Sequence, residues 1–418
     1  MVLTLTASAI GFGVATVSAD GVPPPTLGDL TFFGRGYGHG VGMSQYGARG
    51  RALAGQLAPA ILAHYYAKTT LGTRSPTKAV RVLLLTGLAA TPAKPLTVVG
   101  TVGGWTIDGI ATTFPAGAKL TLAPTASGAT TWALRVASST GDVLHSARVS
   151  GDVYVRPVNS TTLLQLVSKA TTTNVYRGIF RLHLTKTAMV INSLGVDRYL
   201  RGVVPLEMPS SWPAEALKVQ AIAARSYALA HLRPTLVFDV YDDTRSQVYR
   251  GRKAETAAGN AAIAATSGKV LLSGTAVANA LFHSADGGWT ENNENVYVSS
   301  TGAIVAGPLP YLRGRSDRAP DGTSYDKASP YATWKTATYT AEALSAILAK
   351  DQRTNVGTLS AIDLSRRGVS KRLISVTLTG SLGTKTVSGG VFVSAFNAGR
   401  PAADPPLRGT LFDTAPIP

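Results

Sequence analysis

The amino-acid sequence predicts an α+β fold, because alternating apolar runs typical of strands and Ala-rich runs with helical spacing both occur along the chain. The chain has 418 residues, of which 45% are hydrophobic and 15% are charged. A chain of this length and composition is ordered, buries a large core and is expected to hold more than one subdomain.

Residues 1–30 are predicted to be a signal peptide and a linker. The apolar run at residues 2–15 is too short to span a bilayer, and Val-Ser-Ala at residues 17–19 offers a small-residue cleavage site. No Lys or Arg precedes this run, and the prolines at residues 23–25 predict a stiff spacer. The chain has no Cys, which excludes a disulfide scaffold and is compatible with the cytosol or with export. We expect an exported protein.

Residues 31–75 are predicted to contribute a Gly-rich loop and a helix to the core. Glycines alternate from Gly34 to Gly42, which excludes a helix there and permits close backbone approach. Their spacing does not match a phosphate-binding loop. A helix is expected from Met43 to Tyr66, where apolar residues recur at helical spacing. These apolar residues are Leu53, Leu57, Ile61 and Tyr65.

Residues 76–175 are predicted to form a β-rich subdomain with a supporting or binding role. Short apolar runs are separated there by Gly, Pro and Ser. The expected strands are residues 80–85, 96–99, 105–107, 120–122 and 132–136. Residues 176–335 are expected to form the main core. Residues 336–418 are expected to complete it with a helix at 340–350 and a β-pair at 374–378 and 384–393.

Glu207 is the most informative single residue. It lies in a segment bracketed by Pro205 and Pro209, which we expect to be a loop that follows a strand ending at Val204. Pro213 suits the first turn of the next helix. A carboxyl group near a helix N-terminus and among apolar residues can be desolvated, which raises its pKa towards use as a general acid. The alternative is a solvated loop residue.

The helix after Pro213 is rich in Ala and is therefore expected to pack closely against its neighbours. Helical spacing places Lys218 and Arg225 on one stripe. It places Gln220, Tyr227 and His231 on another stripe.

Three segments resemble the SpoIID/LytB family of bacterial cell-wall proteins. The strongest is YLRGVVPLEMPSSWPAEALKVQAIAARSYAL at residues 199–229, followed by FHSADGGWTENNENVY at 282–297 and RGYGHGVGMSQYGA at 35–48. Weaker matches are YDDTRSQVY at 241–249 and LRGTLF at 407–412. The resemblance covers most of residues 31–418 except about 76–170. It implies that residues 176–335 form a SpoIID-like catalytic core with the β-rich subdomain inserted before it.

The chain departs from the family pattern in two respects. In many relatives the GHGVGMSQYGA segment follows the EMP segment, whereas here it comes first. Some relatives also bind zinc through cysteines near the QVY segment, and that site cannot exist in this Cys-free chain. His39 and His283 alone are not a zinc ligand set, and no G-x-S-x-G elbow is present. We expect neither a metal nor a cofactor.

The resemblance implies the activity of a peptidoglycan lytic transglycosylase with Glu207 as the acid. Glycoside cleavage normally uses two carboxylates, whereas this reaction needs one. Other carboxylates that remain candidates for the site are Glu215, Asp239, Asp242, Asp243, Asp286, Glu291 and Glu294. The alternative is a non-catalytic enhancer of an N-acetylmuramoyl-L-alanine amidase, because some family members are named in that way.

The matched segments also supply candidate substrate-binding residues. These are Gln220, Arg225, Gln247, Tyr249, His39, His283, Ser284, Glu291 and Asn295. Arg225 can hold a substrate carboxylate, steady a neighbouring acid or form a structural salt bridge. Hydrogen bonding within the loops is the alternative role for the other polar residues.

The net charge of +17 and the pI of about 10.1 favour a polyanionic partner. No long Lys/Arg run, helix-turn-helix or RNP signature is present, so nucleic acid is not expected. Peptidoglycan and its anionic polymers suit an exported, cell-wall-associated protein better, and an amidase is a conceivable partner. The excess of Lys and Arg can also serve solubility alone.

Overall fold

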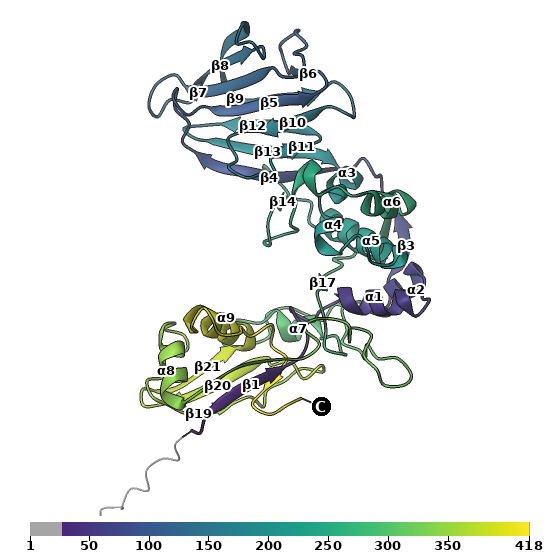
Figure 1. The fold of residues 1–418 in the computed structure, drawn as a ribbon, viewed down its shortest axis with the longest axis vertical. Coiled ribbons are helices and arrows are strands. Elements are labelled where there is room, and N and C mark those ends of the chain that lie inside the picture. The colour runs from purple at the N-terminus through teal and green to yellow at the C-terminus, as the bar shows by residue number, and fades with distance from the viewer. Residues whose placement is uncertain (1–26, 418) are drawn as a thin grey trace, which may run out of the picture.

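The computed structural model describes residues 27–417 and confirms the α+β fold. The predicted cleavage site at residues 17–19 lies outside the described residues. The chain forms three bodies stacked along its long axis: a β-sheet body at the top of Figure 1, a helical body in the middle and an α/β body at the bottom. No helix within residues 27–417 combines the length and the apolar character needed to cross a membrane.

The upper body is a sheet of 11 strands in the order β11-β10-β5-β7-β8-β9-β12-β13-β4-β14, with β6 paired to β9. All neighbours are antiparallel except β14 and β4. The strands are β4 (Ala79–Leu88), β5 (Leu96–Val102), β6 (Trp105–Ile107), β7 (Lys119–Pro124), β8 (Thr131–Ala137), β9 (Val143–Pro157), β10 (Leu163–Leu166), β11 (Val175–Tyr176), β12 (Ile179–Leu184), β13 (Ala188–Gly195) and β14 (Val240–Tyr241). Its core includes the fully buried Trp105 and Trp132. All five strands expected between residues 80 and 136 are confirmed.

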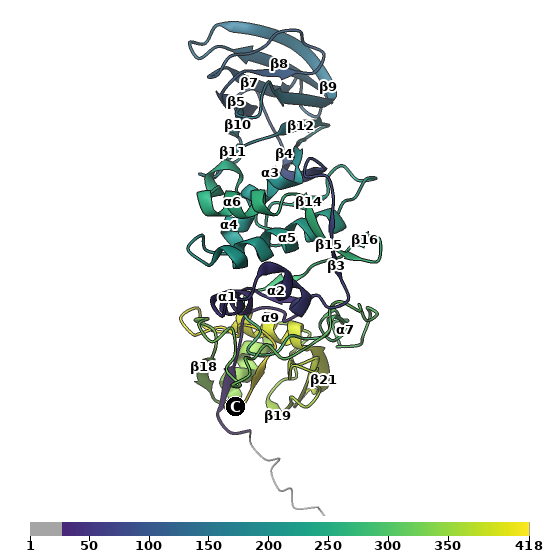
Figure 2. The ribbon, with the colours of Figure 1, turned by 90° about the vertical axis from the view of Figure 1, so that its right-hand side faces the viewer.

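The middle body is built around α5 (Ala214–Ala230). Its Ala side chains are buried almost throughout, so α1 (Gln45–Leu53), α2 (Ala58–Tyr65) and α6 (Ala257–Ala265) can pack against it (Figure 2). The remaining elements of this body are α3 (Val196–Arg201), α4 (Val204–Glu207), the 3₁₀ turn Gly251–Ala254, β3 (Thr70–Thr73), β15 (Lys269–Ser273) and β16 (Ala276–Val277).

Two predictions for this region were wrong. The single helix expected from Met43 to Tyr66 is two helices, because Gly55 adopts φ 82° between them. Leu53 and Leu57, two of the apolar residues at helical spacing, are each 63% exposed. The expected strand end at Val204 is instead the first residue of α4, a single helical turn. Pro205 fits this turn because the first N–H groups of a helix have no partner within it.

The lower body joins the two ends of the described chain. Strand β1 (Leu30–Gly34) pairs with β18 (Trp334–Tyr339) and with β22 (Phe412–Asp413). Its residue Phe32 is fully buried against Phe392, Phe396 and Phe412. The other elements are β19 (Leu359–Asp363), β20 (Ser375–Gly380), β21 (Gly383–Ser388), α8 (Ala341–Ala349) and α9 (Gly389–Gly399).

The strand expected at residues 384–393 ends at Ser388, whose side chain caps α9 by accepting a hydrogen bond from Val391 N. Between the lower and middle bodies, β2 (Met43–Ser44) pairs in parallel with β17 (Phe282–His283), and α7 (Asn293–Val296) follows. The Gly-rich loop and the polar loop after residue 283 therefore lie side by side.

Candidate active site

Glu207 ends α4 and is half-buried. Its Oε2 accepts a hydrogen bond of 3.1 Å from Nε2 of Gln45, the first residue of α1. Ser44 fixes the start of α1, because its Oγ accepts a hydrogen bond from Gly47 N at 3.0 Å. The segment that contains Glu207 and the Gly-rich segment thus meet through Gln45.

Burial raises the pKa of Glu207 above its usual value, and the hydrogen bond from Gln45 partly opposes this shift. No carboxylate within residues 27–417 contributes to the shift. A half-buried carboxyl group with a raised pKa holds its proton at a higher pH than a solvated one and can still be reached from outside. Glu207 has the properties of a proton donor.

The predicted stripe of Gln220, Tyr227 and His231 extends along α5 from the neighbourhood of Glu207. Gln220 is fully buried, and its Oε1 lies 3.5 Å from Gln45 Nε2. Burial is the largest cause that raises the pKa of Tyr227, the Arg233 guanidinium opposes the rise, and the Glu207 carboxylate adds to it. The Tyr227 ring stacks on that of His231 with centroids 4.1 Å apart.

Tyr227 and His231 line a cavity of ≈ 490 Å³ at the C-terminal end of α5. The irregular segment at residues 279–281, α7 with the following Tyr297, and the loop at residues 306–312 close its other sides. The remaining lining residues are Asn279, Leu281, Asn293, Tyr297, Ala306, Gly307, Leu309 and Leu312.

Ser284 joins the third matched segment to this region. Its carbonyl oxygen accepts a hydrogen bond of 2.9 Å from the backbone N–H of Tyr46. The ring of Tyr46 lies edge-on to Trp212 with centroids 4.8 Å apart, and the Arg49 guanidinium lies 5.5 Å from the Trp212 ring. Aromatic and polar groups therefore flank Gln45.

His39 and His283 lie next to each other, with ring centroids 5.3 Å apart. His39 Nδ1 accepts a hydrogen bond from Val41 N, so its Nε2 carries the proton and donates to Phe282 O at 3.1 Å. Burial lowers the pKa of His39 to about 4 and lowers that of His283 well below its usual value. Both rings are therefore neutral at pH 7. No described cluster of three or more His, Asp or Glu is arranged to hold a metal ion.

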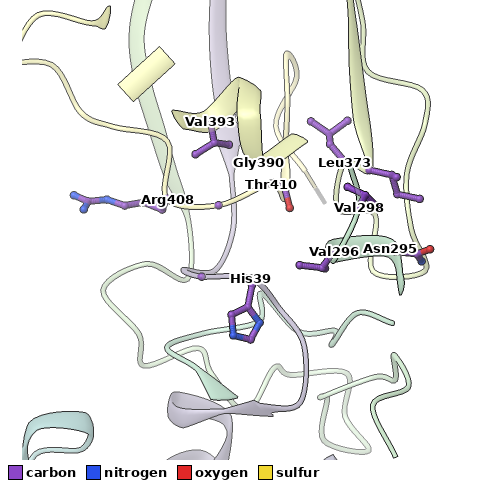
Figure 3. Close-up of a pocket in the computed structure, with 12 residues that line it drawn as sticks. His39, Asn295, Val296, Val298, Leu373, Gly390, Val393, Arg408 and Thr410 are labelled. Carbon is purple, nitrogen blue, oxygen red and sulfur yellow. The ribbon is translucent and has the colours of Figure 1, made fainter. Parts of the chain in front are cut away.

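A second cavity, of ≈ 220 Å³, contains His39 and Asn295 rather than Glu207 (Figure 3). Val296, Val298, Leu373 and other apolar residues make up most of its wall. His39 and Asn295, two of the predicted substrate-binding residues, thus line a cavity together with residues of the lower body.

Glu291 is buried and points into the lower body. Its carboxylate accepts hydrogen bonds from Ser370 N at 2.9 Å, Ser370 Oγ at 2.6 Å and Asn295 Nδ2 at 2.8 Å. These contacts tie the polar loop to the turn at residues 368–370. We therefore assign Glu291 to loop structure and not to substrate binding.

Arg225, Gln247 and Tyr249 are also in the interior and not in a cleft. The Arg225 guanidinium is fully buried and donates from Nε to Asp197 Oδ1 at 2.6 Å. Gln247 accepts a hydrogen bond from Tyr199 at 3.3 Å, and Tyr249 donates one to Asn192 at 2.9 Å. The structural alternative considered for these residues fits their placement better than substrate contact does.

A second carboxyl group with a raised pKa is Asp286, which is fully buried. Its pKa is raised well above the usual value by burial and by the neighbouring carboxylates of Asp317 and Asp326. Gly288 N donates to its Oδ1 at 2.8 Å, and no described N–H or O–H group donates to its Oδ2. The raised pKa favours a protonated Asp286, and its carboxyl group is a hydrogen-bonding neighbour of Asp317. Asp317 in turn accepts from Arg51 Nε at 2.8 Å.

Sequence reasoning did not single out Gln45, Trp212, Asn279 or Tyr297. Gln45 and Trp212 lie within the quoted family-like segments, so their position in those segments was an available signal. Asn279 carried no such signal, because its place in the cavity depends on contacts between segments far apart in the chain.

Comparison with known proteins confirms the predicted resemblance. Residues 184–272 match the model of the SpoIID family, described as Stage II sporulation protein. The chain is 35% identical over 142 residues to an uncharacterized protein of Brachyspira hyodysenteriae, covering 33% of this chain and 36% of that protein. It is 35% identical over 147 residues to the Amidase enhancer of Bacillus subtilis, covering 34% and 20% of the two proteins.

The Stage II sporulation protein D of Bacillus subtilis is 32% identical over 166 residues, covering 35% of this chain and 44% of that protein. The chain thus spans less than half the length of each of these relatives. The matches support a role related to the bacterial cell wall.

Proposed function

From its similarity to the SpoIID/LytB family, we propose that this protein is a lytic transglycosylase that cleaves peptidoglycan glycan strands. The observation that carries the proposal is the half-buried Glu207, whose pKa is raised by burial and which keeps a side open to solvent. A general acid needs both properties, because it must hold a proton near neutral pH and must reach the substrate oxygen.

In the proposed reaction, Glu207 donates its proton to the oxygen between N-acetylmuramic acid and N-acetylglucosamine, and the bond from that oxygen to muramyl C1 breaks. The Glu207 carboxylate then accepts the proton of the muramyl C6 hydroxyl, whose oxygen forms a new bond to C1. The products are a 1,6-anhydro-muramyl end and a free N-acetylglucosamine end. Because no water is consumed, no second carboxylate is needed to activate one, in contrast to hydrolysis.

Gln45 has a positioning role in this scheme. Its amide holds one oxygen of Glu207 and leaves the other to face the substrate. The hydrogen bond also stabilises the carboxylate formed after the first proton transfer.

Digestion of purified glycan strands, with mass detection of the products, tests the proposal. We expect fragments with 1,6-anhydro-muramyl ends. Reducing muramyl ends would show hydrolysis and contradict the mechanism.

The second candidate is a wall-bound enhancer of an amidase, which the similarity to the Amidase enhancer of Bacillus subtilis favours. Stimulation of a cell-wall amidase by wild type and Glu207→Gln to the same extent, with no glycan cleavage by either, would support that function.

A further inference from the structure

A third cavity, of ≈ 270 Å³, lies in the lower body, where the start of the Gly-rich segment, the polar loop and the turn at residues 368–371 meet. Its lining residues do not include Glu207, Gln45 or Gln220, so it is separate from the candidate active site. Small-molecule sites typically have volumes of about 300–1,000 Å³. This cavity can therefore take the end of a ligand and not a whole strand.

Three cationic side chains line this cavity, and they come from separate segments of the chain: Arg35, Arg318 and Lys371. None of the described residues that line it is Asp or Glu. Arg318 donates a hydrogen bond from Nη1 to Gly322 O at 2.9 Å, and within residues 27–417 neither Arg318 nor Lys371 forms a salt bridge. Cations gathered without a counter-charge attract an anion, so we expect an anionic ligand.

The carboxylates behind this wall are used inside the lower body. Glu291 accepts a hydrogen bond from Ser370 N at 2.9 Å, and Asp326 accepts one from Gly287 N at 2.7 Å. Both carboxylates are buried. Burial lowers the pKa of Arg372, and the charges of these two carboxylates oppose that shift, so the buried guanidinium is their neighbouring cation. The three cations of the cavity remain available to a ligand from outside.

Lys371 has an unusual backbone conformation. Its φ is 69°, in the left-handed region that favours Gly, and among the other non-Gly residues of the described chain only Lys68 has a positive φ. Lys371 lies in a tight turn, where its N–H donates to Gly368 O at 3.1 Å and Gly368 N donates to Arg372 O at 2.8 Å. A Gly would fit this backbone with less strain. The turn thus holds an ammonium group at the cavity despite backbone strain, a combination found at functional sites.

Two glycines of the polar loop allow the walls of the cavity to approach each other. Gly287 and Gly288 have φ of 74° and 95°. A Cβ on Gly287 would lie 2.8 Å from Leu411 Cδ2, and a Cβ on Gly288 would lie 3.2 Å from Arg318 Nη2. The Arg318 guanidinium therefore lies against bare backbone at the edge of the cavity.

The rest of the wall has an apolar character. Trp289 is 40% exposed and Val369 is 50% exposed, and the buried Leu411 closes the inner side. An inorganic anion would leave this apolar surface unused. The end of a peptide combines a carboxylate with an apolar side chain and uses both parts of the wall.

We propose that this cavity binds the C-terminal carboxylate of a peptide that ends in an apolar residue. Arg318 Nε and Nη2 make no hydrogen bond within residues 27–417, and they form the pair of N–H groups that binds a carboxylate in a bidentate manner. Lys371 adds a second cation, and Trp289 and Val369 contact the apolar side chain. The site is independent of the proposed glycan cleavage.

The test measures binding of N-acetyl-Ala-Ala-Ala with a free carboxylate to the full chain by isothermal titration calorimetry. Wild type and Glu207→Gln should bind it equally, and the same peptide with a C-terminal amide should bind at least about tenfold more weakly, the scale of a lost hydrogen bond between charged groups. Arg318→Gln should weaken binding of the free peptide to a similar extent.

Lys371→Gly is the sharpest variant, because it removes the ammonium group and relieves the backbone strain together. It should weaken peptide binding about tenfold without lowering the melting temperature. Lys68→Gly is the matched control, since Lys68 is also an exposed lysine with positive φ, at 60°, but does not line the cavity. It should leave both the affinity and the folded state unchanged.

Equal affinity for the free and amidated peptides, unchanged affinity in Lys371→Gly, or no binding by the folded wild type would overturn the assignment. Tighter binding of the all-D peptide would identify cell-wall peptides as the source of the ligand, and tighter binding of the all-L peptide would identify the end of a protein chain. Either result upholds the carboxylate site. Peptide binding by a protein that fails to cleave glycan strands would uphold this site and contradict the proposed reaction.

Discussion

Glu207 and Asp286 are two carboxyl groups with raised pKa values in very different surroundings. Glu207 is half-buried and receives one hydrogen bond from a neutral amide. Asp286 is fully buried and faces the carboxylates of Asp317 and Asp326. Burial is the largest cause of the shift in both. The pKa direction therefore does not by itself separate a proton donor for substrate from a structural acid.

The two carboxyl groups differ in the acceptors that their protons can reach. The proton of Asp286 is confined to the interior, next to the buried Asp317, which also binds Arg51 of α1. The proton of Glu207 has no protein acceptor among the described residues and can leave towards a bound ligand. Glu207 combines a raised pKa with a carboxyl group that a ligand can reach. This combination marks it as the candidate acid.

The largest expected effect comes from exchanging each acid for its amide. Glu207→Gln keeps the shape but cannot supply an acidic proton, so glycan cleavage should fall about 10²–10⁴-fold. Asp286→Asn should leave cleavage close to wild type, because the amide can still donate to Asp317. Product release from purified glycan strands measures both. Retained glycan cleavage in Glu207→Gln would contradict the assignment of Glu207 as the proton donor.

The next largest effect concerns stability. Asp286→Ala leaves Asp317 without this donor in a buried site and should lower the free energy of unfolding by about 1–3 kcal/mol. Asp286→Asn should cost less, since it preserves a donor. Urea unfolding at pH 5 measures both variants. Equal stability of the Ala and Asn variants would show that the shared proton contributes nothing.

The stability difference should also depend on pH. The pKa of Asp286 is raised in the folded state, so its stabilising contribution is complete below the unfolded value of about 3.9. It is lost as the pH rises through the folded-state pKa. Wild type should therefore lose stability relative to Asp286→Asn as the pH rises from 4 towards neutrality. Parallel stability curves for the two proteins would contradict the shared proton.

A smaller effect is expected from Gln45→Leu. Loss of this donor removes the hydrogen bond that lowers the pKa of Glu207, so the pKa should rise further. The alkaline limb of the pH profile of kcat/KM, where the acid loses its proton, should move to higher pH. Gln352→Leu, at an exposed position, is the control. An unmoved alkaline limb in Gln45→Leu would show that another group sets it.

The smallest expected effect is that of salt concentration on binding to the cell wall. The net charge of +17 should attract anionic wall polymers, and exposed charges are screened within about 8 Å at physiological ionic strength. Sedimentation with purified cell wall should show weaker binding at high salt. Salt-independent wall binding would point to sugar contacts in place of charge.

Much of the fold follows from local pattern. Pro213 and the Ala-rich run predict α5, and period-two apolar runs predict β4 to β8. The long strand β9 (Val143–Pro157) was not predicted, because most of its first ten residues are exposed and carry little apolar alternation. Backbone pairing with β8 and β12 stabilises β9 as a strand, although its own sequence does not predict one.

The candidate site was predictable only in part. The stripe of Gln220, Tyr227 and His231 follows from helix geometry, and the structure places it beside Glu207 and the cavity. The structural roles of Arg225 and Glu291 depend on Asp197 and Ser370, partners that lie 28 and 79 residues away in sequence. Pairings across such distances depend on the tertiary fold and cannot be read from spacing.

The pairing of β1 with β18 and β22 has a consequence for how the protein matures in the cell. Residues 30–34 are synthesised well before their partners at 334–339 and 412–413. Contacts between such distant segments form slowly during folding. Because the Gly-rich loop and Gln45 follow β1 directly, the hydrogen bond from Gln45 to Glu207 is expected to form correctly only after residues 412–413 have been synthesised. A nascent chain would therefore be inactive until residues 412–413 have docked on β1.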